Sequence, residues 1–71
     1  MKDQQRVKFG KHVAGLRKAQ RMTQQQVAEM AGLKLVTVKN VEAGNFNVPL
    51  DVLCRIAVVL GGELQIIIKE D

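Results

Sequence analysis

The segment TQQQVAEMAGLKLVTVKNVEAG, residues 23–44, predicts two short helices joined by a tight turn. Thr23 and Gln26 have the spacing of a capping box, in which the hydroxyl accepts from the amide three residues on and the glutamine reaches back. Gly32 is expected to end the first helix, because a left-handed backbone costs glycine little. Such a pair can hold its second helix, which Gly44 ends, out from the body of the domain.

Apolar residues at helical spacing predict which faces of these two helices are buried. The residues expected to point inward are Val27, Ala28, Ala31, Leu33, Val38 and Val41. The small side chain of Ala28 lets the two helices cross closely. Taken alone, this pattern is also that of an ordinary helical hairpin inside an all-α domain.

Two further helices are predicted on either side of this pair. A first helix is expected over residues 5–20, with Phe9, Val13 and Leu16 on its inner face. After a loop at residues 45–48, Pro49 is expected to start a last helix, because the missing proline amide costs little there. The residues expected to form the core face of that helix are Leu50, Leu53, Ile56, Ala57 and Leu60, and residues 61–62 end it. The sequence therefore predicts an all-α fold, a compact bundle of four to five helices.

Length and composition indicate one small domain. The chain has 71 residues, near the size at which core burial alone is marginal. We expect a single domain over residues 1–71, with a helical core at residues 1–62. The sequence has no run of 18 apolar residues and no signal peptide, so we expect no membrane association and a cytoplasmic, nucleoid-associated protein. Cys54 is the only cysteine, and its apolar helix predicts a buried structural thiol.

Residues 63–71 differ in character from the helical part. Three consecutive isoleucines and an alternating pattern favour a strand. A strand with no second strand in its own chain needs a partner edge. We therefore expect an antiparallel pairing with the same strand of a second copy, giving a two-fold homodimer. The residues expected at that contact are Leu64, Ile66, Ile67 and Ile68. The alternative is a frayed tail, or one that folds back onto its own core.

Charge is distributed unevenly along the chain. Residues 1–41 carry nine Lys or Arg residues and two acids, whereas residues 42–71 carry two basic and five acidic residues. The net charges are therefore +7 and −3, which together make the overall +4. A basic half that contains the two-helix stretch is typical of a surface that binds phosphates. An ordinary solvated basic surface is the alternative.

The full pattern T-Q-x-x-V-A-x-x-A-G-L-x-x-x-T-V-x-x-V-E-x-G resembles the Xre-type helix-turn-helix of phage repressors and Cro, over roughly residues 9–60. The resemblance implies that the second helix reads the major groove of double-stranded DNA. It also implies a dimer on a palindromic operator, with half-sites about one helical turn apart. Gly10 lies where this family usually has a glycine, which implies close packing against another helix.

The resemblance also assigns roles to individual residues. Gln24, at the start of the first motif helix, would bond a DNA phosphate. The residues expected to form the reading edge are Lys34, Leu35, Val36 and Thr37, with Lys39 and Asn40 one turn on. Asn40 can pair with an adenine edge, because its amide offers both a donor and an acceptor. The two lysines are expected to clamp phosphates, with a guanine contact as the alternative for Lys34, and Thr37 can serve a phosphate or a base.

Two other positions carry family roles. Arg17 and Glu42 match a pair that bridges the first and third helices, and Arg17 either faces a phosphate as well or is purely structural. Asn45 and Asn47, beyond the reading helix, are expected to contact the DNA backbone. 

The sequence departs from the family at the reading edge. Leu35 and Val36 stand where such repressors usually have polar residues, and Lys34 is a poor N-cap. Apolar side chains can read only thymine methyl groups or DNA shape. Three explanations remain open: a thymine-rich site, a relaxed reader of low specificity, or a surface that binds protein.

Catalysis finds no support in the sequence. His12 is the only histidine, and we expect no catalytic residues, no metal site and no cofactor. Two phenylalanines are too few to stack bases in a single-strand or RNA-binding module. The resemblance to Xre-type repressors thus implies a dimeric repressor or autoregulator that binds double-stranded DNA. A subclass is an antitoxin with a toxin protein as partner, and the alternative is a protein-interaction module that has lost sequence-specific DNA reading.

Overall fold

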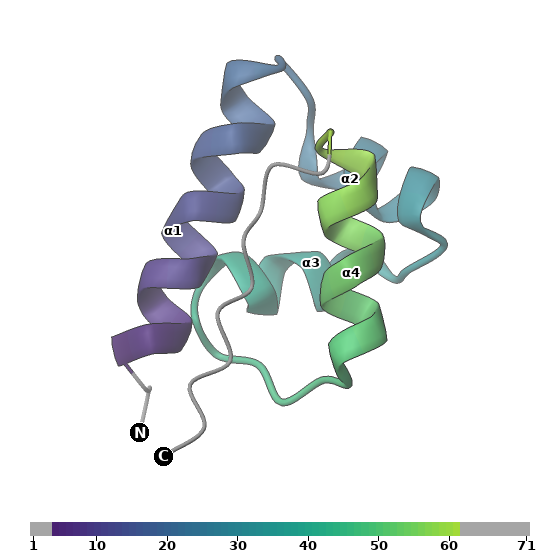
Figure 1. Ribbon diagram of the computed structural model, residues 1–71. Helices are drawn as coiled ribbons and strands as arrows, with labels where there is room; N and C mark the ends of the chain where they lie inside the picture. The colour runs from purple at the N-terminus through teal and green to yellow at the C-terminus, as the bar shows by residue number, and fades with distance from the viewer. Residues whose placement is uncertain (1–3, 62–71) are drawn as a thin grey trace.

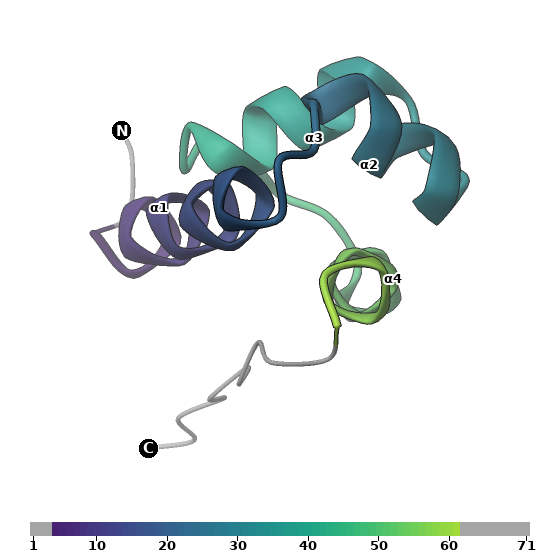
Figure 2. The same cartoon turned by 90° about the horizontal axis from the view of Figure 1, so that it is seen from above.

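The computed structural model describes residues 4–61, and all regular structure in this range is helical. Four helices follow one another along the chain (Figure 1): α1 (Gln4–Ala19), α2 (Gln24–Ala31), α3 (Leu35–Glu42) and α4 (Leu50–Val59). The predicted all-α class is confirmed, and the limits predicted for the first helix differ from those of α1 by one residue at each end. In the view from above, α2 and α3 lie along one side of the molecule and α4 along the other (Figure 2).

Each of the four helices contributes to one hydrophobic core. Its buried members are Val13, Val27, Ala28, Val38, Val41, Ile56, Ala57 and Leu60. The half-buried side chains of Phe9, Leu16, Leu33 and Leu53 pack against them. Each fully buried Val, Leu or Ile is worth roughly 1.5–3 kcal/mol relative to an exposed one. The core therefore supplies the main force that holds α3 against α1 and α2, and α4 against α2.

The contact between α1 and α3 depends on Gly10. This glycine is buried, and a Cβ atom added to it would collide with the backbone carbonyl oxygens of Val41 and Glu42. Because those atoms belong to helix backbone, they cannot move aside for a side chain. The close packing expected at Gly10 is confirmed, and it brings the last turn of α3 directly onto α1.

The end of α1 shows a feature that the sequence pattern did not indicate. Arg21 has a φ of +58°, and in the described range it is the one residue other than glycine with a positive φ. The amide of Arg21 donates to the carbonyl of Lys18 at 3.0 Å, and that of Met22 to the carbonyl of Arg17 at 3.1 Å. This pair of bonds is the Schellman arrangement, whose C′ position is usually glycine. The chain therefore turns from α1 into α2 at an arginine in an unfavourable conformation.

Three expectations about α4 are corrected by the structure. Pro49 is the N-cap residue, with α4 starting at Leu50, and the Leu50 side chain is 47% exposed rather than part of the core. Cys54 is exposed, not buried. It lies two residues before the buried Ile56, which at about 100° per residue puts it on the opposite side of the helix. A shallow open hollow there is lined by Met30, Ala31, Cys54, Arg55, Val58 and Val59.

The predicted strand and its dimer contacts, Leu64, Ile66, Ile67 and Ile68, lie outside the described residues. The subdivision of the chain at residue 62 therefore stays a prediction. Within residues 4–61, none of the helices has the length and apolarity needed to cross a lipid bilayer.

Candidate DNA-binding surface

The turn between α2 and α3 is built by local hydrogen bonds that hold both ends of α2. The amide of Gln26 donates to Thr23 Oγ1 at 3.0 Å, and the amide of Thr23 donates to Gln26 Oε1 at 2.8 Å, so the predicted capping box is present. At the other end, Gly32 has a φ of +69° and ψ of +34°, in the left-handed region. The amide of Leu33 then donates to the carbonyl of Ala28 at 2.8 Å. These bonds make the direction of α3 a consequence of residues 23–33.

The first residues of α3 form the predicted reading edge. Lys34 is an exposed N-cap residue, and its side chain makes no capping hydrogen bond, as its poor capping character predicted. Val36, Lys39 and Asn40 are exposed, whereas Leu35 and Thr37 are half-buried. The opposite face of α3 is fully buried through Val38 and Val41. The helix thus presents one mixed face of cationic, amide and apolar groups to the outside.

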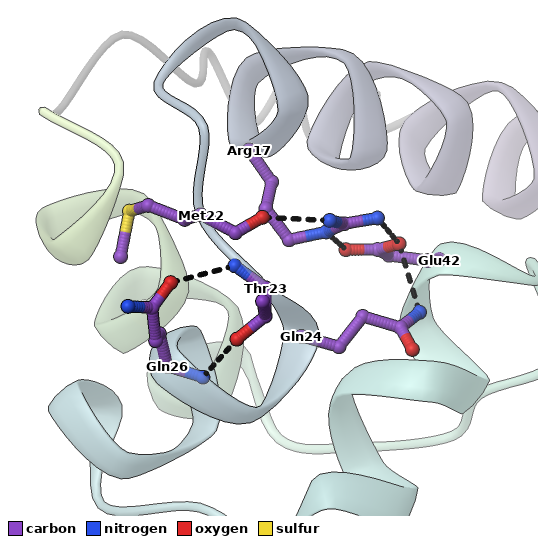
Figure 3. A network of polar contacts seen from close by, with 6 residues as sticks. All are labelled: Arg17, Met22, Thr23, Gln24, Gln26 and Glu42. Atoms are coloured by element: carbon purple, nitrogen blue, oxygen red, sulfur yellow. Dashed lines mark hydrogen bonds and ion pairs between the residues drawn. The ribbon is translucent and has the colours of Figure 1, made fainter.

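A polar network fixes α3 to the other two helices that surround it (Figure 3). Arg17 Nε donates to Glu42 Oε2 at 2.6 Å, and Arg17 Nη2 donates to Glu42 Oε1 at 3.0 Å. Arg17 Nη1 also donates to the Met22 carbonyl at 2.8 Å. The Arg17 and Glu42 side chains are only 12% and 6% exposed. The expected pair between the first and third helices is therefore confirmed as a desolvated, two-point contact.

Gln24 joins the same network from α2. Its Nε2 donates to Glu42 Oε1 at 3.0 Å, so α1, α2 and α3 each supply one side chain to the network. An amide nitrogen has two hydrogens. One of them is used by Glu42, and the phosphate contact predicted for Gln24 requires the other. No signal in the sequence indicated this contact between Gln24 and Glu42, because it joins residues 18 positions apart.

The hydrogen bonds of this network act on the pKa of Arg17. The side-chain hydrogen bond to Glu42 raises the pKa of Arg17 above its ordinary value, while burial acts in the opposite direction. Charge-assisted two-point pairs of this kind are stronger than neutral hydrogen bonds and have a defined orientation. Three of the five guanidinium N–H groups are engaged, which favours the structural role for Arg17.

The loop after α3 is anchored to α1 by aromatic and backbone contacts. Gly44 has a φ of +74° and lies against the backbone of Val7, where a Cβ would collide. The Phe46 ring is half-buried, with its centroid 6.0 Å from that of Phe9, and the guanidinium carbon of Arg6 lies 5.7 Å from the Phe46 centroid. Asn45 and Asn47, on either side of Phe46, are exposed. The anchoring by Phe46 was not predicted, and it holds the two asparagines beside the end of α3.

Most of the predicted site residues fall into two groups, and the half-buried Leu35 and Thr37 belong to neither. An exposed group, which shares the outer side of α3 and the loop after it, comprises Lys34, Val36, Lys39, Asn40, Asn45 and Asn47. The second group is Arg17 and Gln24, whose side chains donate hydrogen bonds to Glu42, the last residue of α3. No cluster of three or more metal-ligating side chains occurs within residues 4–61.

The arrangement of a capped helix, a glycine turn and an outward-facing second helix defines a helix-turn-helix unit. The helix-turn-helix family model matches residues 13–67, which is most of the chain. The chain therefore belongs to the Xre-like helix-turn-helix family of DNA-binding transcription regulators.

A solved structure of similar fold is the crystal structure of the restriction-modification controller protein C.AhdI from Aeromonas hydrophila. The two chains share 34% sequence identity over 82% of this chain and 88% of that chain, with a TM-score of 0.79. The search of curated proteins found no match.

Proposed function

We propose that this chain is a transcription regulator that binds a specific double-stranded DNA site as a dimer. The observation that supports it most directly is the exposed face of α3, where Lys34, Val36, Lys39 and Asn40 stand clear of a fully buried opposite face. Helices of this unit place their amino-terminal residues against base edges in the major groove.

Each group on that face has a chemistry suited to DNA. Asn40 can make two hydrogen bonds to an adenine edge, and the ammonium groups of Lys34 and Lys39 can neutralise phosphates. This proposal includes further contacts to the DNA phosphate backbone, made by Asn45, Asn47 and the second amide hydrogen of Gln24. The network of Arg17, Gln24 and Glu42 holds these contacts in register, because it joins α1, α2 and α3 at one place.

The similarity to C.AhdI supports one kind of regulator in particular. That protein is a restriction-modification controller, and the two chains are alike over most of both lengths. We therefore favour an autoregulator that binds a palindromic operator near its own gene, in the cytoplasm. Binding of a toxin protein is the second form of this proposal, and it rests on the sequence of residues 63–71.

The experiment that tests the proposal is selection of preferred duplexes from a random pool by the full chain. We expect one enriched sequence with two-fold symmetry. A plot of log affinity against log salt concentration should be a straight line, whose slope is about −0.9 for each phosphate that the protein neutralises. A protein-interaction module of the same fold would enrich no sequence. Equal affinity for the selected and a scrambled duplex at every salt concentration would therefore refute specific reading.

A further inference from the structure

Val36 is an apolar side chain at the place where bases would be read. It lies in the first turn of α3 and is 57% exposed. Residues three and four positions further on share its helix face, and these are the exposed Lys39 and Asn40. The buried side chains of α3, Val38 and Val41, point to the other side. Val36 is thus an apolar group set among polar ones on the outer face of the helix.

The stability of the fold does not account for a valine at this position. Valine is a weaker helix former than alanine, lysine or glutamine, and the first turn of a helix favours acidic or small polar residues. Val36 is outside the buried core cluster and the side chains that pack on it. Its branched side chain holds one preferred χ1 rotamer in a helix, so little rotamer freedom is lost on binding. These properties suit a contact with a partner.

We infer that Val36 reads the C5-methyl group of a pyrimidine in the major groove. A valine side chain has no hydrogen-bond donor or acceptor, so the remaining recognisable feature of a base edge is its apolar surface. Among the four bases, thymine carries such a group, a methyl on C5. The same methyl on the same carbon distinguishes 5-methylcytosine from cytosine. The ligand class is therefore a duplex with a C5-methylated pyrimidine opposite Val36, and this rests on the proposed DNA binding.

The thymine arm of the test removes methyl groups and nothing else. Each thymine of the selected duplex is replaced in turn by deoxyuracil, which keeps every hydrogen-bonding group and lacks the methyl. For the wild-type chain we expect affinity to fall about fourfold for each buried methyl group at one position per half-site. In Val36→Ser the same replacement should change affinity by less than about 1.5-fold, since the apolar partner is gone.

The cytosine arm shows whether the methyl alone is sufficient. At the position found with deoxyuracil, the base pair is changed to cytosine–guanine, with the cytosine either plain or methylated on C5. If methylation of this cytosine raises the affinity about fourfold, Val36 recognises the methyl group of 5-methylcytosine as well as that of thymine. No gain, together with a thymine effect that is lost in Val36→Ser, would restrict it to thymine.

Val58→Ser is the matched control, because Val58 is also an exposed valine (76%) but lies on α4, in the hollow next to Cys54. It should keep the wild-type thymine-to-deoxyuracil ratio. Val36→Thr, which keeps one methyl and the branched shape, should give an intermediate ratio and guards against a folding defect in Val36→Ser.

Two results would overturn methyl reading. A ratio near one at every position of the wild-type site would show that no methyl is read, and an equal ratio in wild type and Val36→Ser would assign the reading elsewhere. If specific duplex binding holds in either case, only the inference fails. Absence of any preferred duplex would defeat the proposed function and this inference together.

Discussion

Arg17 and Glu42 join α1 to α3 through two parallel hydrogen bonds of 2.6 and 3.0 Å, in surroundings where both side chains are almost fully buried. Glu42 at the same time accepts from Gln24 on α2. One carboxylate on α3 thus bonds to both of the helices that pack against it. A raised pKa on a cation means that its stabilising effect is present at all pH values below its unfolded pKa. The Arg17 guanidinium thus adds no pH dependence to stability near neutral pH.

Removing one partner of this pair should destabilise the fold strongly. Arg17→Met leaves the Glu42 carboxylate buried with Gln24 alone, and we expect a loss of about 3–5 kcal/mol in the free energy of unfolding. Urea denaturation followed by circular dichroism measures this. The double variant Arg17→Met, Glu42→Leu should lose less than the sum of the two single variants, because no unpaired charge remains. Additive losses would show that the two charges do not interact.

Asn40 and Lys39 should have different effects on DNA binding. Asn40→Ala is expected to cost about 1–3 kcal/mol on the selected site and to relax preference at one base pair. Lys39→Ala should weaken all duplexes by a similar factor and reduce the salt slope by about one. Titrations of a duplex series at several salt concentrations measure both effects. Equal losses for both variants on every sequence would contradict these roles.

Arg21→Gly should stabilise the protein. The φ of +58° at the end of α1 is unfavourable for arginine and accessible to glycine, so we expect a gain of about 1 kcal/mol, less the extra unfolded-state entropy of glycine. Gly32→Ala is the reverse substitution at a similar backbone conformation, because Gly32 has a φ of +69° and an added Cβ would meet open space. Its free energy of unfolding should fall by about 1 kcal/mol. Thermal unfolding measures both. A loss of stability in Arg21→Gly would mean that the arginine side chain makes a stabilising contribution larger than the backbone cost.

Cys54 should react readily with a thiol reagent in the native protein. Its side chain is exposed in the hollow between α2 and α4, so we expect native labelling with a disulfide reagent at a rate close to that of the urea-unfolded chain. Cys54→Ser controls for reaction elsewhere. A native thiol that is unreactive at high protein concentration and reactive on dilution would instead indicate that a second copy covers this face.

Deletion of residues 63–71 tests the predicted dimer. If these residues pair between two copies, the truncated chain should sediment as a monomer where the full chain sediments as a dimer. Its helical content should stay unchanged, since the four helices and the core cluster that joins them lie within residues 4–61. A truncated chain that remains dimeric would rule out the strand pairing.

Most of the fold could be predicted from the sequence, because the features that determine where helices start and end act over a few neighbouring residues. The capping box of Thr23 and Gln26 and the left-handed turn at Gly32 act over a few residues, and both are present as expected. Helical periodicity likewise identified Val13, Val38, Val41 and Ile56 as buried. Periodicity assigned Leu50 to the core incorrectly, because Leu50 is the first residue of α4 and its side chain is 47% exposed.

The candidate site was less predictable, because its supporting contacts join distant parts of the chain. The exposed edge at Lys34, Val36 and Asn40 follows from helix geometry alone. The attachment of Gln24 to Glu42 and the packing of Phe46 on Phe9 depend on how three helices come together.

The limits of the motif helices and the outward face of α3 follow from the sequence without any tertiary contact, since caps and periodicity are properties of short segments. Which polar residues are engaged became clear only from the packed helices. Gln24 bonds to Glu42 at the end of α3, Cys54 is exposed, and Arg21 has a left-handed conformation. Burial and pairing depend on how helices cross, and residues far apart in the chain determine that crossing together.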